Sequence, residues 1–185
     1  VYELFGKYEV MFDGMDGALG DQYNHLATTE NRGIAQCING TGNQITKAGF
    51  WAKKTGTPTG SMVAKVYAMT GTFGTNGRPT GTALATSANF DVSTLPTGTE
   101  TYNEIAFTGA NQITLSSGTN YCISFEYSGG SSSNQVDMVV LIAGTGSEHP
   151  GNASYWNGTT WATTTYGSLG SSGSHDDLCF TVYGY

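Results

Sequence analysis

The stretch from Leu115 to Tyr127 alternates large apolar side chains with small or polar ones. One side of an extended chain there carries Tyr121, Ile123, Phe125 and Tyr127, and the other side carries Cys122, Ser124 and Glu126. A period of two is typical of a strand with one face in a core. The Ser, Gly and Thr residues at 116–119 indicate a turn before it. We therefore expect this strand to be the one on which the other apolar segments pack.

Other apolar segments of strand length follow the same pattern, and they cover residues 33–38, 45–54, 62–69, 104–108, 136–143 and 178–183. In the segment 45–54, Ala48, Phe50 and Ala52 share one side, and Trp51 lies on the other with two lysines. Residues 56–60 contain two glycines and a proline, which supply turn geometry. The segments on either side of them are therefore predicted to form a hairpin.

The chain shows no convincing amphipathic helix, and Gly-, Ser- and Asp-rich loops separate its strand-like segments. We predict an all-β fold, a two-sheet antiparallel β-sandwich of the jelly-roll type with about 8–10 strands and little or no helix. Residues 33–185 are predicted to form this domain. Residues 1–32 are predicted to be an N-terminal arm and an Asp/Gly-rich loop that pack on the sandwich or exchange out of it.

Composition narrows the classes of partner. Aromatic residues make up 12% of the 185 residues, which is enough for a core, whereas charged residues make up only 11%. The net charge of −7 argues against nucleic-acid binding, which needs clustered Lys and Arg. No run approaches the roughly 20 apolar residues that span a bilayer. Few charges with many Gly and Thr residues are common in extracellular, cell-surface and virion β-proteins, and we expect such a location.

Three segments together resemble the galactose-binding-like jelly-roll modules of bacterial surface proteins and phage structural proteins. They read QITKAGFWAKKTGTPTGSMVAKVYA, LSSGTNYCISFEYSGG and DDLCFTVYGY, and the resemblance extends over roughly residues 33–185. The bend TGTPTG and the turn-plus-strand SSGTNYCISFEY are its most specific parts. Modules of this kind bind glycans or form non-catalytic parts of fibres and capsid surfaces. The resemblance therefore implies a binding or structural role.

Four aromatic residues are candidates for contact with a glycan or a protein partner. Trp51 faces away from the core side of its strand, and Tyr155, Trp156 and Trp161 lie in a segment predicted to be a loop. Aromatic faces stack on sugar rings, and the same rings become energetic centres at protein interfaces. The alternative is that Trp156 and Trp161 fold inward as a lid on the core.

Five aspartates are candidates for a structural calcium site. Asp13, Asp16 and Asp21 share one loop, and Asp176 and Asp177 precede the last strand. A jelly roll often brings its first and last strands together, and Ca²⁺ prefers such oxygen ligands. The spacing does not match the EF-hand pattern, and solvated loop carboxylates are the alternative. We expect no other cofactor.

The three cysteines form no CxxC motif, which argues against zinc and redox sites. Cys122 and Cys179 are both predicted to lie on the non-core side of their strands, so they are a candidate disulfide with Cys37 as a free thiol. Three free thiols are the alternative.

The first twelve residues are candidates for an assembly arm. The candidate contact residues among them are Tyr2, Leu4, Phe5, Tyr8, Val10 and Phe12. Such an arm can complete the sheet of a neighbouring subunit by strand addition. The alternative is that it pairs within its own domain.

Catalytic groups are sparse. Glu104 and Glu126 face outward on predicted strands, and a jelly-roll glycosidase would use two such carboxylates. Ser174, His175 and Asp176 are contiguous, so they do not form a triad, which assembles across a fold. We therefore expect a non-catalytic structural or adhesive module on a virion or cell surface, with copies of itself or other surface proteins as partners. A carbohydrate-binding module is the alternative, and a secreted carbohydrate-active hydrolase ranks third.

Overall fold

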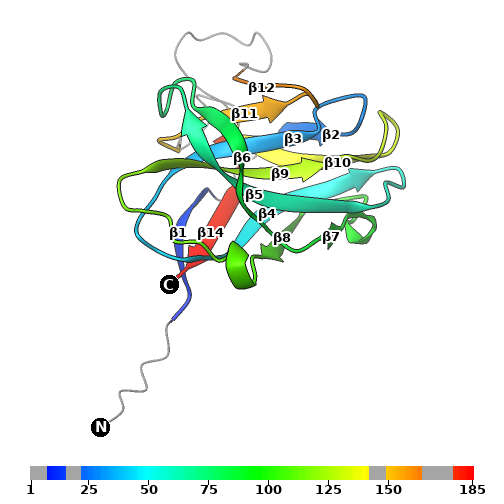
Figure 1. Ribbon diagram of the computed structural model, residues 1–185. Coiled ribbons are helices and arrows are strands. Elements are labelled where there is room, and N and C mark those ends of the chain that lie inside the picture. The colour runs from blue at the N-terminus through cyan, green and yellow to red at the C-terminus, as the bar shows by residue number, and fades with distance from the viewer. Residues whose placement is uncertain (1–7, 16–21, 142–148, 164–176) are drawn as a thin grey trace.

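The chain folds into two facing antiparallel sheets (Figure 1). Among the residues that the structure describes, each sheet has seven strands. The computed structural model describes residues 8–15, 22–141, 149–163 and 177–185. In the first sheet, called sheet A, the strands are ordered β1 (Val10–Met15), β14 (Phe180–Gly184), β4 (Ile45–Thr55), β10 (Gln135–Leu141) and β13 (Asp177–Leu178). Two more strands, β2 (Gln22–Leu26) and β8 (Thr101–Ala106), pair with β10 and β4.

The second sheet, called sheet B, has the order β12 (Trp161–Ala162), β11 (Ala153–Trp156), β3 (Gly33–Asn39), β9 (Asn120–Tyr127), β5 (Ser61–Thr70) and β6 (Arg78–Thr86). Strand β7 (Phe90–Asp91) pairs with β5. In the described residues the only helical segments are two 3₁₀ turns, η2 (Val92–Thr94) and η3 (Gly109–Asn111). The prediction of an all-β, two-sheet antiparallel sandwich is confirmed. No helix in the part of the chain described is long and apolar enough to cross a bilayer.

Strand β9 lies at the centre of sheet B, between β3 and β5. Its alternate side chains Tyr121, Ile123, Phe125 and Tyr127 all enter the main core, as the sequence pattern predicts. The ring of Phe125 lies 5.1 Å from that of Phe50 on the opposite sheet. The two sheets are therefore held together by side chains that face inward with a period of two.

The predicted hairpin between segments 45–54 and 62–69 is wrong. Strand β4 pairs with β8, β10 and β14 of sheet A, whereas β5 pairs with β6, β7 and β9 of sheet B. The connection between them crosses from one sheet to the other. Both strands bury one face in the same core, so they face each other across it rather than pairing edge to edge. Turn residues alone do not distinguish these two arrangements.

Several strands lie where the sequence pattern indicated loops, and they are β2, β6, β11 and β12. Strand β6 contains Pro79 and Gly81, which the interior of a sheet rarely accepts. It lies at the edge of sheet B, and its register with β5 shifts between Val66 and Ala68. Sheets tolerate such residues at an edge and at a bulge. These same residues interrupt the alternation of apolar and polar side chains, so the sequence did not indicate a strand here.

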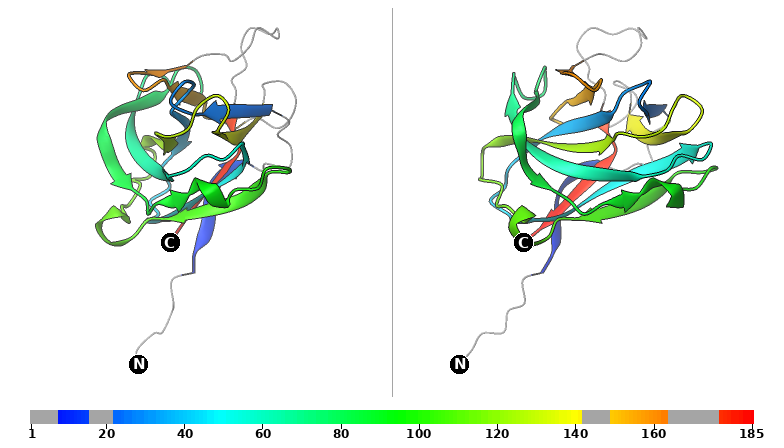
Figure 2. Two further views of the ribbon diagram at one scale, coloured as in Figure 1. Left: turned by 90° about the vertical axis from the view of Figure 1, so that its right-hand side faces the viewer. Right: turned by 45° about the vertical axis from the view of Figure 1, so that its right-hand side comes forward.

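The start of the described chain pairs within its own domain. Strand β1 lies beside β14 at one edge of sheet A in both views of Figure 2. Phe12 packs against the main core, whereas Tyr8, Val10 and Met11 are 83%, 50% and 57% exposed. The arm residues Tyr2, Leu4 and Phe5 lie outside the described residues. Of residues 1–32, the described part therefore adds β1 and β2 to sheet A.

Candidate functional site

The four candidate aromatic residues separate into three environments. Tyr155 is only 4% exposed and belongs to the main core. Trp156 and Trp161 are half-buried and line a hollow of about 580 Å³ on the outer face of sheet B. Trp51 lines a second hollow, of about 320 Å³, on the outer face of sheet A. Only Trp156 and Trp161 are brought together.

The hollow on sheet B, called the sheet-B groove, contains the two tryptophans at one side. They are paired across the β11–β12 hairpin, with ring centroids 5.5 Å apart and ring planes at 39°. Trp161 also meets the edge of the Tyr67 ring at 6.2 Å. The Asn157 side chain accepts hydrogen bonds from the backbone N–H groups of Thr159 and Thr160, each at 2.9 Å, which fixes the turn between the tryptophans.

Charged side chains from the neighbouring strands complete the groove. The Lys65 ammonium lies 2.5 Å from one Glu126 oxygen. The other Glu126 oxygen accepts hydrogen bonds from the Tyr67 hydroxyl at 2.8 Å and the Ser124 hydroxyl at 2.9 Å. Burial raises the pKa of Tyr67, and the Glu126 carboxylate raises it further, so Tyr67 remains a neutral donor. Glu126 therefore acts as an anchor for its neighbours, since its oxygens are already occupied.

Arg78 also lines the groove, and its position depends on a buried amide. The Asn152 side chain accepts a hydrogen bond from Gly77 N–H at 3.0 Å and donates one to the Gly77 carbonyl at 2.9 Å. This pair of bonds ties the start of β6 to the segment before β11. Arg78 has no carboxylate partner among the described residues, and its guanidinium contacts only the Asn76 carbonyl. Within the described ranges, Arg78 is thus a cation of the groove without an ion-pair partner.

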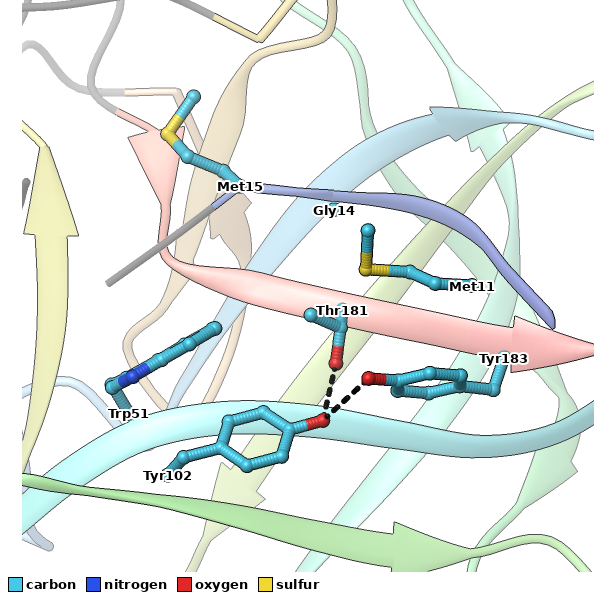
Figure 3. A pocket seen from close by; sticks show the side chains of 7 residues that line it. All are labelled: Met11, Gly14, Met15, Trp51, Tyr102, Thr181 and Tyr183. Atoms are coloured by element: carbon cyan, nitrogen blue, oxygen red, sulfur yellow. Dashed lines mark hydrogen bonds between the residues drawn. The ribbon is translucent and has the colours of Figure 1, made fainter. Parts of the chain in front are cut away.

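The hollow on sheet A is an aromatic platform with little free hydrogen-bonding capacity (Figure 3). The rings of Trp51 and Tyr102 pack at 4.7 Å across β4 and β8. The Tyr102 hydroxyl lies 2.8 Å from the Thr181 hydroxyl, 3.0 Å from a Glu104 oxygen and 3.3 Å from the Tyr183 hydroxyl. Burial is the main cause that raises the pKa of Tyr102. The polar atoms of this hollow therefore form hydrogen bonds mainly with one another.

The aspartates proposed for calcium are only partly brought together. Asp13 and Asp177 both bond to His149: Asp13 Oδ1 lies 2.8 Å from Nε2, and the His149 backbone N–H donates to Asp177 Oδ2 at 3.0 Å. Asp16, Asp21 and Asp176 lie outside the described residues. No cluster of three or more metal-binding side chains occurs within the described ranges. Calcium binding stays a prediction.

The two outward-facing carboxylates predicted for a hydrolase do not share a site. Glu104 lies on β8 of sheet A, where Lys47 bridges it to Glu9. Glu126 lies on β9 of sheet B, in the sheet-B groove. Ile105 and Phe125, next to them in the sequence, are buried in the core, so each glutamate faces away from it. The two carboxylates therefore lie on opposite outer faces, and a two-carboxylate mechanism needs them within about 10 Å of each other.

The cysteines are arranged differently from the candidate disulfide. The Cys122 sulfur lies 3.2 Å from that of Cys37, on the adjacent strand β3. Cys179 lies in sheet A, between β13 and β14, and belongs to the main core rather than to its outer side. The structure does not bring Cys122 and Cys179 together. All three are thiols in this structure.

The sequence pattern indicates the two tryptophans but not most of their neighbours in the groove. Lys65 and Tyr67 alternate with Ala64, Val66 and Ala68 on β5, so their outward direction was visible in the sequence. That they face Trp156 and Trp161 was not visible, because it depends on the strand order of sheet B.

No protein-family model, no curated protein and no solved structure matches this chain. What the fold and the site define is a class, a two-sheet β-sandwich with a polar aromatic groove on the outside of one sheet. The likeness to galactose-binding-like modules stays a prediction.

Proposed function

We propose that the chain is a non-catalytic carbohydrate-binding module and that the sheet-B groove is its binding site. The observation that carries the proposal is the pair of half-buried tryptophans in the same hollow as Lys65 and Arg78. Sugar rings need an aromatic surface for their C–H faces and charged or polar groups for their hydroxyls. The groove offers both within one hollow of about 580 Å³, a size typical of small-ligand sites.

The proposal is tested by removing one ring of the pair. In Trp161→Ala, affinity for an oligosaccharide identified on a glycan array should fall about tenfold or more, because stacking energy and the Tyr67 contact are both lost. Isothermal titration calorimetry measures the affinity, and circular dichroism confirms that the variant is folded. The matched control is Trp51→Ala, which removes a half-buried tryptophan from the opposite sheet.

Two results would contradict the proposal. The first is a glycan array without any binding by the folded wild-type chain. The second is a Trp51→Ala variant that loses as much affinity as Trp161→Ala, since that would move the site to the outer face of sheet A.

A structural or adhesive role on a virion or cell surface is the second candidate, and the exposed edge strand β1 favours it. The outer edge of β1 has no strand partner among the described residues, and Val10 and Met11 on it are exposed. Exposed apolar edge strands readily pair with another chain. The partner in this case would be a second copy of the chain.

This second candidate is tested by placing charge on the edge. Val10→Lys should convert a self-associating chain to a monomer, because lysine on an edge strand opposes pairing. Size-exclusion chromatography with light scattering measures the mass. Leu84→Lys on β6, the edge of sheet B, is the matched control. A wild-type chain that is monomeric at high concentration, or an equal effect of Leu84→Lys, would exclude assembly through β1.

A further inference from the structure

Two cysteines lie directly opposite each other in the middle of sheet B. Cys37 on β3 is in register with Cys122 on β9, and these strands lie side by side (Figure 1). Their sulfur atoms are 3.2 Å apart, and both side chains are fully buried. They form a small cluster with Ala35 on the outer side of the sheet, covered by Met69, Phe73 and Trp161.

The strand register gives this pair the geometry that a cross-strand disulfide needs. The Cys37 N–H donates to the Asn152 carbonyl at 3.0 Å, which directs the peptide group toward β11 and away from β9. Three residues further on, Gly40 N–H donates to the Thr119 carbonyl of the partner segment at 2.8 Å. By the alternation of an antiparallel ladder, Cys37 and Cys122 are a non-hydrogen-bonded pair.

Non-hydrogen-bonded pairs are the close pairs of an antiparallel ladder. Their Cα atoms are separated by about 4.5 Å. This separation falls within the range of about 4.4–6.8 Å that disulfides require. The strands therefore need not move for the two sulfur atoms to bond.

We propose that Cys37 and Cys122 form a disulfide when the chain folds in an oxidising compartment, with a small-molecule disulfide such as glutathione disulfide as the oxidant. One cysteine thiolate attacks a sulfur of glutathione disulfide, which gives a mixed disulfide and releases one glutathione thiolate. The second cysteine thiolate attacks the protein sulfur of the mixed disulfide and displaces the second glutathione. The protein thiols lose two protons and two electrons, and glutathione disulfide is reduced to two glutathiones.

Burial sets the stage of folding at which this exchange takes place. The hydrogen bond to Cys37 and burial raise the pKa of Cys122, and both side chains are fully buried, so glutathione disulfide cannot reach either sulfur in the closed sheet. The exchange therefore precedes the closure of sheet B. Once formed, the bond ties β3 to β9 in the small cluster against which Trp161 packs.

The test counts thiols in the whole chain. The reduced, unfolded chain is refolded with a mixture of oxidised and reduced glutathione, and a second sample is exported to a bacterial periplasm. Each sample is then denatured in N-ethylmaleimide without reductant and weighed intact. We expect one added maleimide, on Cys179, against three in a sample treated with reductant first. A non-reducing protease digest should give a peptide that links Cys37 to Cys122.

Variants separate this pairing from the others. After oxidation, Cys179→Ser should take up no maleimide, whereas Cys37→Ser should take up two. Three maleimides on both oxidised wild-type samples would overturn the proposal, and so would a digest that links Cys122 to Cys179. The wild-type digest decides the pairing even where the Cys37→Ser chain does not fold.

Discussion

At the scale of single residues, the sheet-B groove separates two kinds of charged group. Glu126 accepts hydrogen bonds or an ion pair from Lys65, Tyr67 and Ser124, so its charge is satisfied within the protein. Arg78 lacks a carboxylate partner in the described part of the chain, although the whole chain has a net charge of −7. An isolated guanidinium in an acidic protein is suited to a carboxylate on a ligand.

Arg78→Gln should therefore weaken binding of acidic oligosaccharides more than that of neutral ones. We expect roughly a tenfold loss for a ligand that carries a uronic acid, because a hydrogen bond to a charged group is worth about 1.5–3 kcal/mol. Calorimetry with matched acidic and neutral oligosaccharides measures the difference.

The control for this variant is Lys54→Gln, which removes a positive charge from sheet A. Equal losses for the two variants would indicate a general effect of net charge rather than a contact with Arg78. Equal losses for acidic and neutral ligands would also contradict the prediction.

At the scale of elements, the connection between β4 and β5 determines how the two sheets are joined. Gly56 and Gly60 both have positive φ, at 68° and 94°. A Cβ on Gly56 would lie 2.2 Å from the Ser133 carbonyl oxygen, whereas a Cβ on Gly60 would meet nothing within 4 Å. The Asn134 side chain also accepts a hydrogen bond from Thr57 N–H at 2.7 Å. Gly56 is thus held against the loop that precedes β10.

Gly56→Ala should lower the free energy of unfolding by about 2–4 kcal/mol, because a backbone contact and an unfavourable φ both act on the new side chain. Gly60→Ala is the matched control, and it should cost only about 1–2 kcal/mol, since it has the strain without the contact. Urea unfolding followed by circular dichroism measures both. If the two variants lose the same stability, the close approach of Ser133 is not the reason that residue 56 must be glycine.

The same elements show what the sequence could predict. The alternation from Tyr121 to Tyr127 is local, and it identified β9 and its buried face correctly. The partner of a strand is not local: the turn residues before β5 are compatible with a hairpin and with a crossing between sheets. For this reason the sequence predicted only the tryptophans of the groove. The strand order of sheet B, which is not local, brings Trp156 and Trp161 into the same hollow as Lys65 and Arg78. Pro79 and Gly81 concealed β6 because they interrupt its pattern.

At the scale of the whole molecule, a buried polar network links the two sheets. Gln36 extends from sheet B and donates a hydrogen bond to Asp177 Oδ1 at 2.7 Å, while its own oxygen accepts one from Leu178 N–H at 2.9 Å. His149 joins this network through its contact with Gln36 at 3.2 Å and extends it to Asp13. The sequence predicts that Asp13 and Asp177 lie near each other, but it gives no sign of Gln36 and His149, which connect them.

Stability should decrease as pH rises above about 10. The pKa values of Tyr67, Tyr102 and Tyr127 are all raised from 10.0, mainly by burial. The folded chain therefore keeps these protons at a pH where the unfolded chain loses them, so the contribution is complete below pH 10 and is lost as pH rises. Urea unfolding at a series of alkaline pH values measures this slope.

Tyr67→Phe is the control. Phenylalanine has no ionisable proton, so the decrease of stability with pH should be less steep in this variant. An unchanged slope in this variant, or wild-type stability that is constant across the alkaline range, would contradict the assignment.

The position of β14 has a consequence for the synthesis of the chain. This strand lies between β1 and β4, so it fills an interior position of sheet A although it comes after both of them in the chain. Until these residues have been added, β1 lacks its one strand partner among the described residues, and residues 45–50 of β4 lack a neighbour on one side. Sheet A can therefore be completed only after translation has passed residue 184. A nascent chain stopped before β14 should remain a target for chaperones, however much of sheet B has already formed.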